Sequence, residues 1–374
     1  GREIIPVDKM QVKRVVRQMV EKEDVKAFTI SGYAGVINPA HELQVKQIIR
    51  EETGLFVTCG HELSEILNFK TRAHTAMLNA RIIPKLTKLI LDLEKALASA
   101  GIFAPIMVVK GDGTLMSAKT AKERPVETIL SGPAASVAGA RHLTGLQNAL
   151  VVDMGGTTTD AAVLSDGTVS VCEAGSNVGG QKTHVKALEI RTAGLGGDSL
   201  IQWHKGNFYI GPRRVAPVAW LSAMTPGCSQ ALEFLNLNLD RYIVSTQNMQ
   251  ILALTGSPDN LDLTDQEEKI IRLLESRPLS MFELVKRTGV LFERSLRLGR
   301  LEEHFLIQRC GLTLTDLLHV TGRFERWDKV AALSFCRMFS RLTKMEIPAM
   351  ADHLLEMGIE RLVLELLKRQ LDDE

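Results

Sequence analysis

The chain has 374 residues, and 45 lysines and arginines against 44 aspartates and glutamates leave a formal net charge of +1. At about 100–200 residues per domain, this length predicts two or three domains. An apolar fraction of 45% with 24% charged residues excludes wholesale disorder. The sequence contains no run of about 18 apolar residues, so no membrane span is predicted. The balanced charge gives no electrostatic reason to expect a nucleic-acid or membrane partner. The five cysteines are scattered without a C-x-x-C pair, which is typical of a reducing, cytoplasmic location and argues against a disulfide framework or a zinc knuckle.

Residues 1–147 alternate predicted helices with short apolar strands, the pattern of an α/β region with buried strands. The expected helices cover residues 8–21, 40–51 and 72–99, and the expected strands cover residues 25–30, 55–58 and 105–109. Pro84 lies inside the third helix. We expect it to kink or divide that helix, because proline cannot donate the backbone hydrogen bond of a helix interior.

Residues 148–212 predict strands in quick succession around two glycine-rich turns. Strands are expected at 149–153, at 161–164 and 169–172 as a hairpin, and at 184–191. The second glycine-rich turn, at 194–198, is expected to lead into a helix near 199–204.

The remaining chain is predicted to be an irregular, proline-containing connection over 213–262 and a mainly helical domain over 263–374. Thr264 and Glu267 have the spacing of a capping box. The expected helices cover residues 265–276, 280–287, 293–304, 314–320, 327–342 and 349–371.

The order of the first three of these helices is similar to that of a winged-helix module, which raises DNA binding as one hypothesis. Residues 261–374 contain 18 basic and 20 acidic residues, a net charge of −2. A DNA-binding surface has to neutralise several phosphates. Arg294, Arg297 and Arg300 are therefore interpreted as a solvated face, and the helical domain as a scaffold or subunit contact.

The most informative segment is the stretch from Val151 to Leu164, in which an apolar strand ends in Asp153, turns on Gly155-Gly156-Thr157-Thr158 and returns as a second strand containing Asp160. Glycines let backbone N–H groups approach an anion closely, and threonine hydroxyls add donors. Asp153 could hold Mg²⁺ through water, since Mg²⁺ keeps several of its waters. The alternative is a plain β-hairpin whose glycines serve only the turn.

This stretch resembles the phosphate-binding hairpin of the actin/sugar kinase/Hsp70 ATPase superfamily. The segments 110–117, 124–135 and 148–157, with Glu65, Arg72, Thr75 and 78–80 upstream, are similar to the hydantoinase A/5-oxoprolinase family. The resemblance implies an α/β fold with an actin-like ATPase (ribonuclease H-like) core, and ATP and Mg²⁺ as cofactors. It also implies a cytoplasmic, ATP-dependent hydrolase that acts on carbon–nitrogen bonds of small cyclic amides.

The resemblance also suggests roles for individual residues. The amides of Gly155 to Thr158 would hold phosphate oxygens, Asp153 would orient Mg²⁺ and the attacking oxygen, and Asp160 would brace the turn or a second water. Gly196 and Gly197 stand where the family has a glycine-rich turn near the nucleotide, although Leu195 and Asp198 depart from its pattern. The alternative for this turn is a helix start capped by Asp198 or Ser199.

Other candidate residues have simpler interpretations. His61 and Glu65 are four residues apart, but without an H-E-x-x-H pattern a turn residue and a helix-cap partner are favoured over a metal site. Ser131 has no local base that would activate it, so close packing of its helix is favoured. Asp112 lies in a Gly-Asp-Gly turn, where aspartate is a good turn former, and the resemblance adds a substrate-side role as an alternative.

We therefore interpret the chain as a fragment of the catalytic subunit of a cyclic-amide hydrolase, with a second subunit or a homo-oligomer as partner. A first D-x-G-G-T-x-T-D hairpin and a later G-A-P turn are not found in this sequence, so ATP binding by the fragment alone is an open question. An ATP-binding carboxylase subunit and a nonenzymatic ATP-sensing scaffold remain the alternatives.

Overall fold

The computed structural model describes residues 3–23, 25–258 and 261–371. It divides into two compact units. The first unit contains the chain up to Asp153 together with Ala161–Ile190, and the second contains Met154–Asp160 and the chain from Arg191 onward. Among the described residues, none of the helices combines the length and the apolar character needed to span a membrane.

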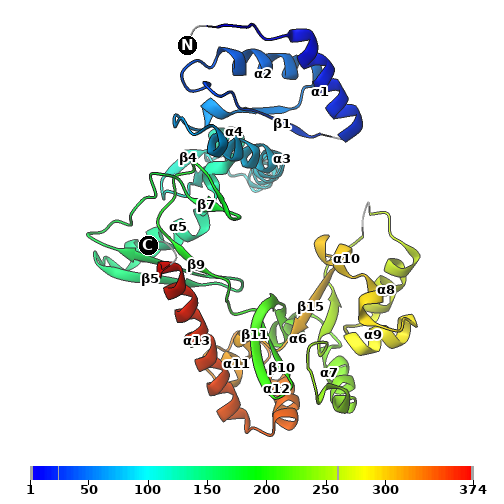
Figure 1. The fold of residues 1–374 in the computed structure, drawn as a ribbon. Helices are drawn as coiled ribbons and strands as arrows, with labels where there is room; N and C mark the ends of the chain where they lie inside the picture. The colour runs from blue at the N-terminus through cyan, green and yellow to red at the C-terminus, as the bar shows by residue number, and fades with distance from the viewer. Residues whose placement is uncertain (1–2, 24, 259–260, 372–374) are drawn as a thin grey trace. The chain divides into compact units, whose positions relative to one another are not determined.

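The N-terminal part of the first unit is built on two short parallel strands. Strand β1 (Ala27–Ile30) pairs with β2 (Phe56–Cys59). The pair lies between α1 (Lys9–Glu23) with α2 (Ala40–Thr53) on one side and α3 (Phe69–Ser99) on the other (Figure 1). Val16, Phe28, Ile49 and Val57 form the core between these elements, because apolar side chains from each helix and strand face the same layer.

The remainder of the first unit consists of short elements, listed here in chain order: β3 (Met107–Val109), β4 (Leu115–Ser117), α4 (Ala118–Glu123), α5 (Ser131–Thr144), β5 (Ala149–Met154), β6 (Thr159–Leu164), β7 (Asn177–Val178) and β8 (Gln181–Lys182). Strands β3 and β4 form an antiparallel pair. Strands β5 and β6 are neighbours in a small sheet. Single turns of 3-10 helix lie at Gly60–Glu62 and Pro125–Thr128.

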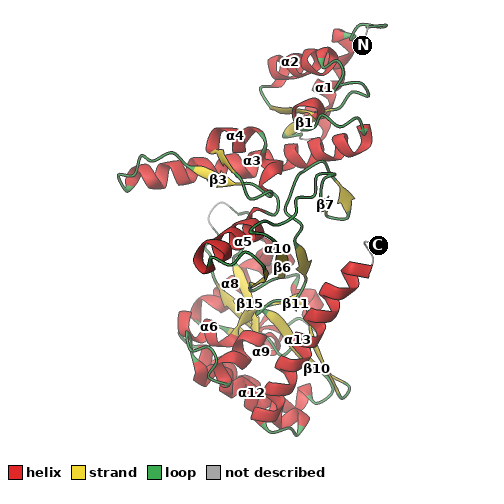
Figure 2. Ribbon diagram, turned by 90° about the vertical axis from the view of Figure 1, so that its left-hand side faces the viewer, coloured by secondary structure: helices red, strands yellow, loops and turns green. Residues whose placement is uncertain are grey.

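In the second unit, helices surround a four-stranded sheet (Figure 2). The sheet has the order β12 (Ala216–Pro217), β15 (Ile307–Gly311), β13 (Ile251–Leu254) and β14 (Leu279–Ser280), in which β12 and β15 are parallel and the other pairs are antiparallel. Strands β10 (Ser199–His204) and β11 (Asn207–Arg214) form a separate antiparallel pair after β9 (Arg191–Ala193). The helices are α6 (Val218–Met224), α7 (Cys228–Leu237), α8 (Asp265–Ser276), α9 (Met281–Thr288), α10 (Gly299–Glu303), α11 (Leu314–Val320), α12 (Lys329–Thr343) and α13 (Ile347–Leu371).

Two hydrophobic cores stabilise the second unit. One gathers the apolar faces of α6, α7, α11, α12 and α13 around β10 and β13, with Phe335 and Phe339 among its largest fully buried side chains. The other lies under α8, α9 and α10 and includes Ile270, Leu284 and Leu301. The mixed α/β class predicted from the sequence is confirmed, and most predicted helices lie within a few residues of their expected bounds.

Several expected elements are wrong. Helix α3 runs undivided through Pro84 over 31 residues. Residues 169–172 and 184–190 are not strands and carry only an isolated bridge between Val171 and Leu188. Residues 199–204 form a strand instead of a helix. Residues 213–262 are not irregular, since they contain α6, α7 and β13, and the expected helix at 293–304 is interrupted by a left-handed residue at Arg297.

Candidate functional site

The glycine–threonine turn between β5 and β6 is open to solvent. The N–H of Gly155 donates to the carbonyl oxygen of Thr158 at 2.9 Å and closes the turn. Gly155, Gly156 and Thr157 are exposed. Within the described part of the chain, no group accepts a hydrogen bond from the amides of Gly156 and Thr157. Free backbone donors in an exposed glycine turn form the kind of concavity that binds anions.

The second glycine-rich turn, between β9 and β10, contacts the first turn through backbone hydrogen bonds. The N–H of Gly197 donates to the carbonyl oxygen of Gly155 at 3.0 Å, and the N–H of Asp198 donates to that of Gly156 at 2.8 Å. Both carbonyl groups of the first turn are thereby held in place. The turn is followed by a strand, and the Ser199 hydroxyl accepts from the N–H of Gly196, so the helix-cap interpretation of Asp198 and Ser199 is wrong.

Glycine is required where these backbones meet. A Cβ atom at Gly196 would lie 2.5 Å from the carbonyl oxygen of Gly156 and 2.7 Å from that of Gly155. A Cβ at Gly197 would lie 2.5 Å from the Thr315 hydroxyl. Because the obstructing atoms at Gly196 belong to backbone, they cannot rotate away as a flexible side chain would. The two turns approach this closely only because neither side has a side chain.

The start of α11 completes the cluster. The N–H of Thr315 donates to the carbonyl oxygen of Gly197 at 3.0 Å. The helix begins with a capping box in which Thr313 and Asp316 hydrogen-bond each other's backbone N–H groups. Asp316 is fully buried and also accepts from the N–H groups of Val218 and Ala219 at the start of α6. One carboxylate therefore fixes the beginnings of two helices.

Three carboxylates belong to or adjoin these turns. Asp160 accepts a hydrogen bond from the Thr192 hydroxyl at 2.5 Å. Asp198 lies beside Gly156, where any Cβ would collide with its carboxylate. Burial raises the pKa of Asp198, and Arg214 partly opposes that effect. Asp153 belongs to the first unit, where it accepts from the Ser136 hydroxyl of α5 at 2.6 Å.

A groove of about 730 Å³ starts at the two turns and continues between α11 and α13. At the turns it is lined by Gly155, Gly156, Gly197, Asp198 and Thr315. Further along it is mainly apolar and includes Leu318, Phe324, Trp327 and Ile359. Arg326 lies over the Trp327 ring at 5.9 Å. The groove therefore offers polar donors at one end and aromatic and apolar surface at the other.

The structure brings together Gly155, Gly156, Thr158, Gly196 and Gly197, all of which the sequence pattern had singled out. Asp160 lies in the same unit, whereas Asp153 lies in the other. Thr315 was missed by sequence reasoning. The capping-box pattern of Thr313 and Asp316 predicts a helix start. No local signal, however, shows that this start contacts a turn more than 100 residues earlier in the chain.

The metal interpretation of His61 and Glu65 gains no support. His61 Nδ1 lies 2.6 Å from Glu42 Oε2 instead, and Glu42 also accepts from the N–H groups of His61 and Gly32. Cys59 lies close to the same pair, but burial raises the pKa of its thiol to about 12. Through its hydrogen bonds to Gly32 and His61, Glu42 anchors the loop that precedes α2.

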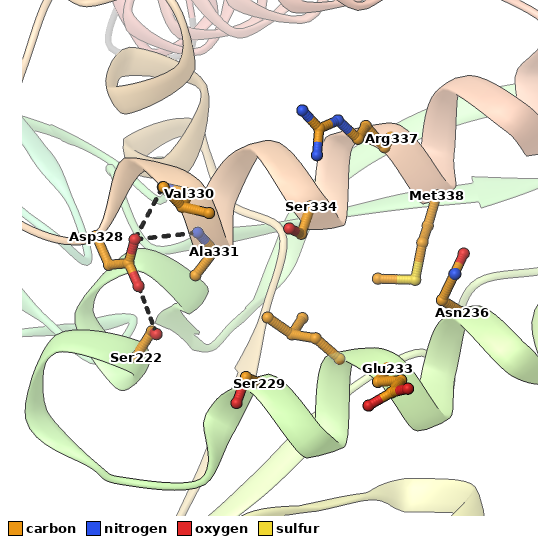
Figure 3. Close-up of a pocket in the computed structure, with 11 residues that line it drawn as sticks. Ser222, Ser229, Glu233, Asn236, Asp328, Val330, Ala331, Ser334, Arg337 and Met338 are labelled. Atoms are coloured by element: carbon orange, nitrogen blue, oxygen red, sulfur yellow. Dashed lines mark hydrogen bonds between the residues drawn. The ribbon is translucent and has the colours of Figure 1, made fainter.

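A smaller cavity of about 360 Å³ lies between α7 and α12 in the second unit. Figure 3 shows that Asp328 accepts hydrogen bonds from Ser222 and from the N–H groups of Val330 and Ala331. These polar groups cap α12, as Asp does at helix starts. The glycine turns and their groove are therefore the stronger candidate in this unit.

Comparison with known proteins identifies the family of the chain. The family described as hydantoinase/oxoprolinase matches residues 72–219, and its N-terminal region matches residues 1–53. The chain belongs to the hydantoinase/oxoprolinase family, which confirms the resemblance seen in the sequence motifs.

Individual relatives are distant and longer. Caprolactamase subunit alpha from Pseudomonas jessenii is 28% identical over 57% of this chain and 31% of its own length. The 5-oxoprolinase of Saccharomyces cerevisiae is 28% identical over 62% of this chain and 18% of its own length. The chain thus spans less than a third of either relative. The nucleotide-free structure of acetone carboxylase has a similar fold, with a TM-score of 0.51 and 19% identity over 81% of this chain and 41% of that one.

Proposed function

We propose that the chain carries the nucleotide site of an ATP-dependent hydrolase that opens cyclic amides of the hydantoin and 5-oxoproline type, on an actin-like ATPase core. The observation that carries this proposal is the Gly155–Thr158 turn, in which the amides of Gly156 and Thr157 have no acceptor among the described residues and the carbonyl groups of Gly155 and Gly156 are held by the second glycine turn. Phosphoryl transfer depends mainly on positioning and on neutralising charge. Fixed backbone N–H donors would position a phosphate group and offset part of its negative charge.

The groove supports a nucleotide as the ligand. Phosphates would lie at the amides of Gly156 and Thr157, and the base would lie toward Phe324 and Trp327, which line the same groove. Every base has a π-face that aromatic rings and arginine can stack on. Arg326 above Trp327 extends that surface.

Carboxylate oxygens near the turns fit the magnesium ion that accompanies ATP. Mg²⁺ prefers oxygen ligands and keeps several waters. We propose that Asp153 holds Mg²⁺ and orients the attacking oxygen. Asp160 would brace the turn through its hydrogen bond with Thr192. Asp198 is a further candidate, because a cation would relieve the cost of a half-buried carboxylate. When bound, the ion would neutralise phosphate charge.

The proposed reaction transfers the terminal phosphoryl group of ATP to the oxygen of the cyclic amide, and ADP leaves. Water then adds to the activated ring carbon. The carbon–nitrogen bond breaks as the nitrogen takes up a proton, which leaves an acyl phosphate. A second water then cleaves this acyl phosphate, and inorganic phosphate is released with the ring-opened carboxylate. We propose a second subunit or a second copy of the chain as partner, since the caprolactamase relative is itself named as a subunit.

Nucleotide binding to the full chain in the presence of Mg²⁺ tests the proposal. Gly156→Ala places a methyl group against Asp198 and should weaken ATP binding at least tenfold. Gly299→Ala in α10, where a Cβ meets nothing within 4 Å, is the matched control and should bind as the wild type does. Equal binding by both variants would contradict a phosphate site at the turn. Binding without hydantoin- or 5-oxoproline-stimulated ATP hydrolysis would instead favour an ATP-sensing scaffold.

A further inference from the structure

The first unit contains a polar cavity of about 500 Å³ that the nucleotide proposal does not use. It forms where the loop after β2, the Lys110-Gly-Asp turn, residues 124–127 and the segment 184–186 meet. Its volume lies within the range of about 300–1,000 Å³ that is typical of small-molecule sites.

The charged groups that line this cavity largely neutralise one another. Lys110 lies 3.0 Å from Asp112 and 3.2 Å from Glu127, and Arg124 also pairs with Glu127 at 3.2 Å. At the rim, Lys186 pairs with Glu173. With Glu65 the lining carries four carboxylates against three cations. Such a lining attracts an anion such as phosphate weakly, and it offers both donors and acceptors to an uncharged polar ligand.

Ser64 and His184 meet at the wall of this cavity although they are 120 residues apart. Ser64 Oγ lies 2.7 Å from His184 Nδ1 and also accepts from the N–H of Ile66 at 3.1 Å. The backbone N–H of His184 donates to the Thr75 hydroxyl, which is buried on α3. Main chain and ring of His184 are therefore both held in place.

These bonds accommodate a tautomer of the histidine that leaves Nε2–H as a donor. Burial lowers the pKa of His184, and Arg72 and Lys182 lower it further, so the ring is neutral near pH 7. The oxygen of Ser64 accepts from Ile66, and its hydrogen can be donated to Nδ1. A neutral imidazole carries one N–H, so with Ser64 as the donor the proton lies on Nε2.

We propose that this cavity binds the cyclic amide, with the Nε2–H of His184 donating to the ring carbonyl oxygen and Ser64 acting as the residue that positions it. A lactam places a carbonyl acceptor beside an N–H donor, and the carboxylates of Asp112 and Glu127 can accept from that N–H. The substrate-side role considered for Asp112 from sequence belongs to the same cavity. This inference rests on the proposed function for the identity of the ligand, but it concerns a different set of residues.

The first experiment reads the tautomer in the full chain labelled with ¹⁵N-histidine. We expect His184 to show the Nε2–H form, and its signal to shift when hydantoin or 5-oxoproline is added without nucleotide. Ser64→Ala should abolish the tautomer preference. An Nδ1–H form in the wild type, or an unchanged His184 signal at saturating amide, would overturn the inference.

The second experiment measures amide affinity by calorimetry. His184→Ala should weaken binding about tenfold, the effect of one lost hydrogen bond to a buried partner. His184→Gln keeps an N–H donor at a similar distance along the side chain and should restore most of the affinity. The control is His142→Ala, an exposed position on α5, which should change nothing. Equal affinities for His184→Ala and the control would also overturn the inference.

Gly156→Ala separates this inference from the proposed function. If it weakens ATP binding but leaves hydantoin binding intact, the two sites are distinct and both proposals stand. If wild-type chain binds ATP at the turn but no cyclic amide perturbs His184, the inference fails while the nucleotide site stands.

Discussion

Replacing Gly196 by alanine tests whether the two glycine turns are held together by their backbones. The added Cβ would lie 2.5 Å from the carbonyl oxygen of Gly156 and 2.7 Å from that of Gly155. The turns would have to separate to accept it. Separation stretches two hydrogen bonds, from Gly197 to Gly155 and from Asp198 to Gly156.

The expected loss of stability follows from these contacts. Each backbone hydrogen bond contributes about 0.5–1.5 kcal/mol net, and forcing an extra methyl group into a packed site costs about 1–3 kcal/mol. Alanine offsets about 0.4–1 kcal/mol by restricting the unfolded chain. The sum is a loss of about 3 kcal/mol in the free energy of unfolding. For a unit of this size, each kcal/mol lost lowers Tm by about 2–4 °C.

Urea unfolding and calorimetry of the full chain would measure this effect, read from the transition of the second unit. Gly194→Ala is the matched control two residues away, since a Cβ there meets nothing within 4 Å. We expect it to change the unfolding free energy by no more than about 0.5 kcal/mol, as surface substitutions usually do. If Gly196→Ala and Gly194→Ala unfold alike, the turns are not in the contact described and the reasoning is refuted.

Three further predictions address the acids and the helical region. Under the proposed function, Asp153→Asn should weaken nucleotide binding modestly while ATP turnover falls by about two orders of magnitude; normal turnover would reduce Asp153 to a turn residue. Burial raises the pKa of Asp316 to about 6, above its value in the unfolded chain, so the stability it contributes is present at low pH and is lost as pH rises from about 4 to about 6. Urea titrations should therefore show wild type losing up to about 3 kcal/mol relative to Asp316→Asn over that window, and parallel pH profiles would contradict the assignment. Finally, the full chain should form no sub-micromolar complex with duplex DNA at about 0.15 M salt, because Arg300 already pairs with Glu267 at 2.8 Å; tight, salt-sensitive binding in a gel-shift assay would revive the DNA-binding alternative.

Elements with strong local signals could be predicted from the sequence. Helix α8 has the predicted bounds because Thr264 and Glu267 form the expected capping box. Elements determined by distant partners could not. The alternation at 184–191 predicted a strand, but the N–H of His184 donates to Thr75 of α3 instead of to a neighbouring strand.

The same distinction applies to the candidate sites. The Gly155–Thr158 turn could be found because consecutive glycines and threonines between two apolar strands are a signal within a short stretch of sequence. The segment 199–204 was predicted as a helix that follows the second glycine-rich turn. In the structure it is a strand that pairs with β11. The pairing runs from His204 opposite Asn207 to Ser199 opposite Arg214. Ser64 and His184 carry no joint signal at a separation of 120 residues.

The link between the two glycine turns has a consequence for the conditions under which the site keeps its shape. Both hydrogen bonds join an amide to a carbonyl group, and neither group titrates or carries a net charge between acid and alkaline pH. Salt screens interactions between charges but has little effect on such a pair. The two hydrogen-bonded glycine turns should therefore persist in buffers that protonate Asp198 or dissociate surface ion pairs. If nucleotide binding is lost in such a buffer, the loss would reflect a change in charge and not collapse of the turns.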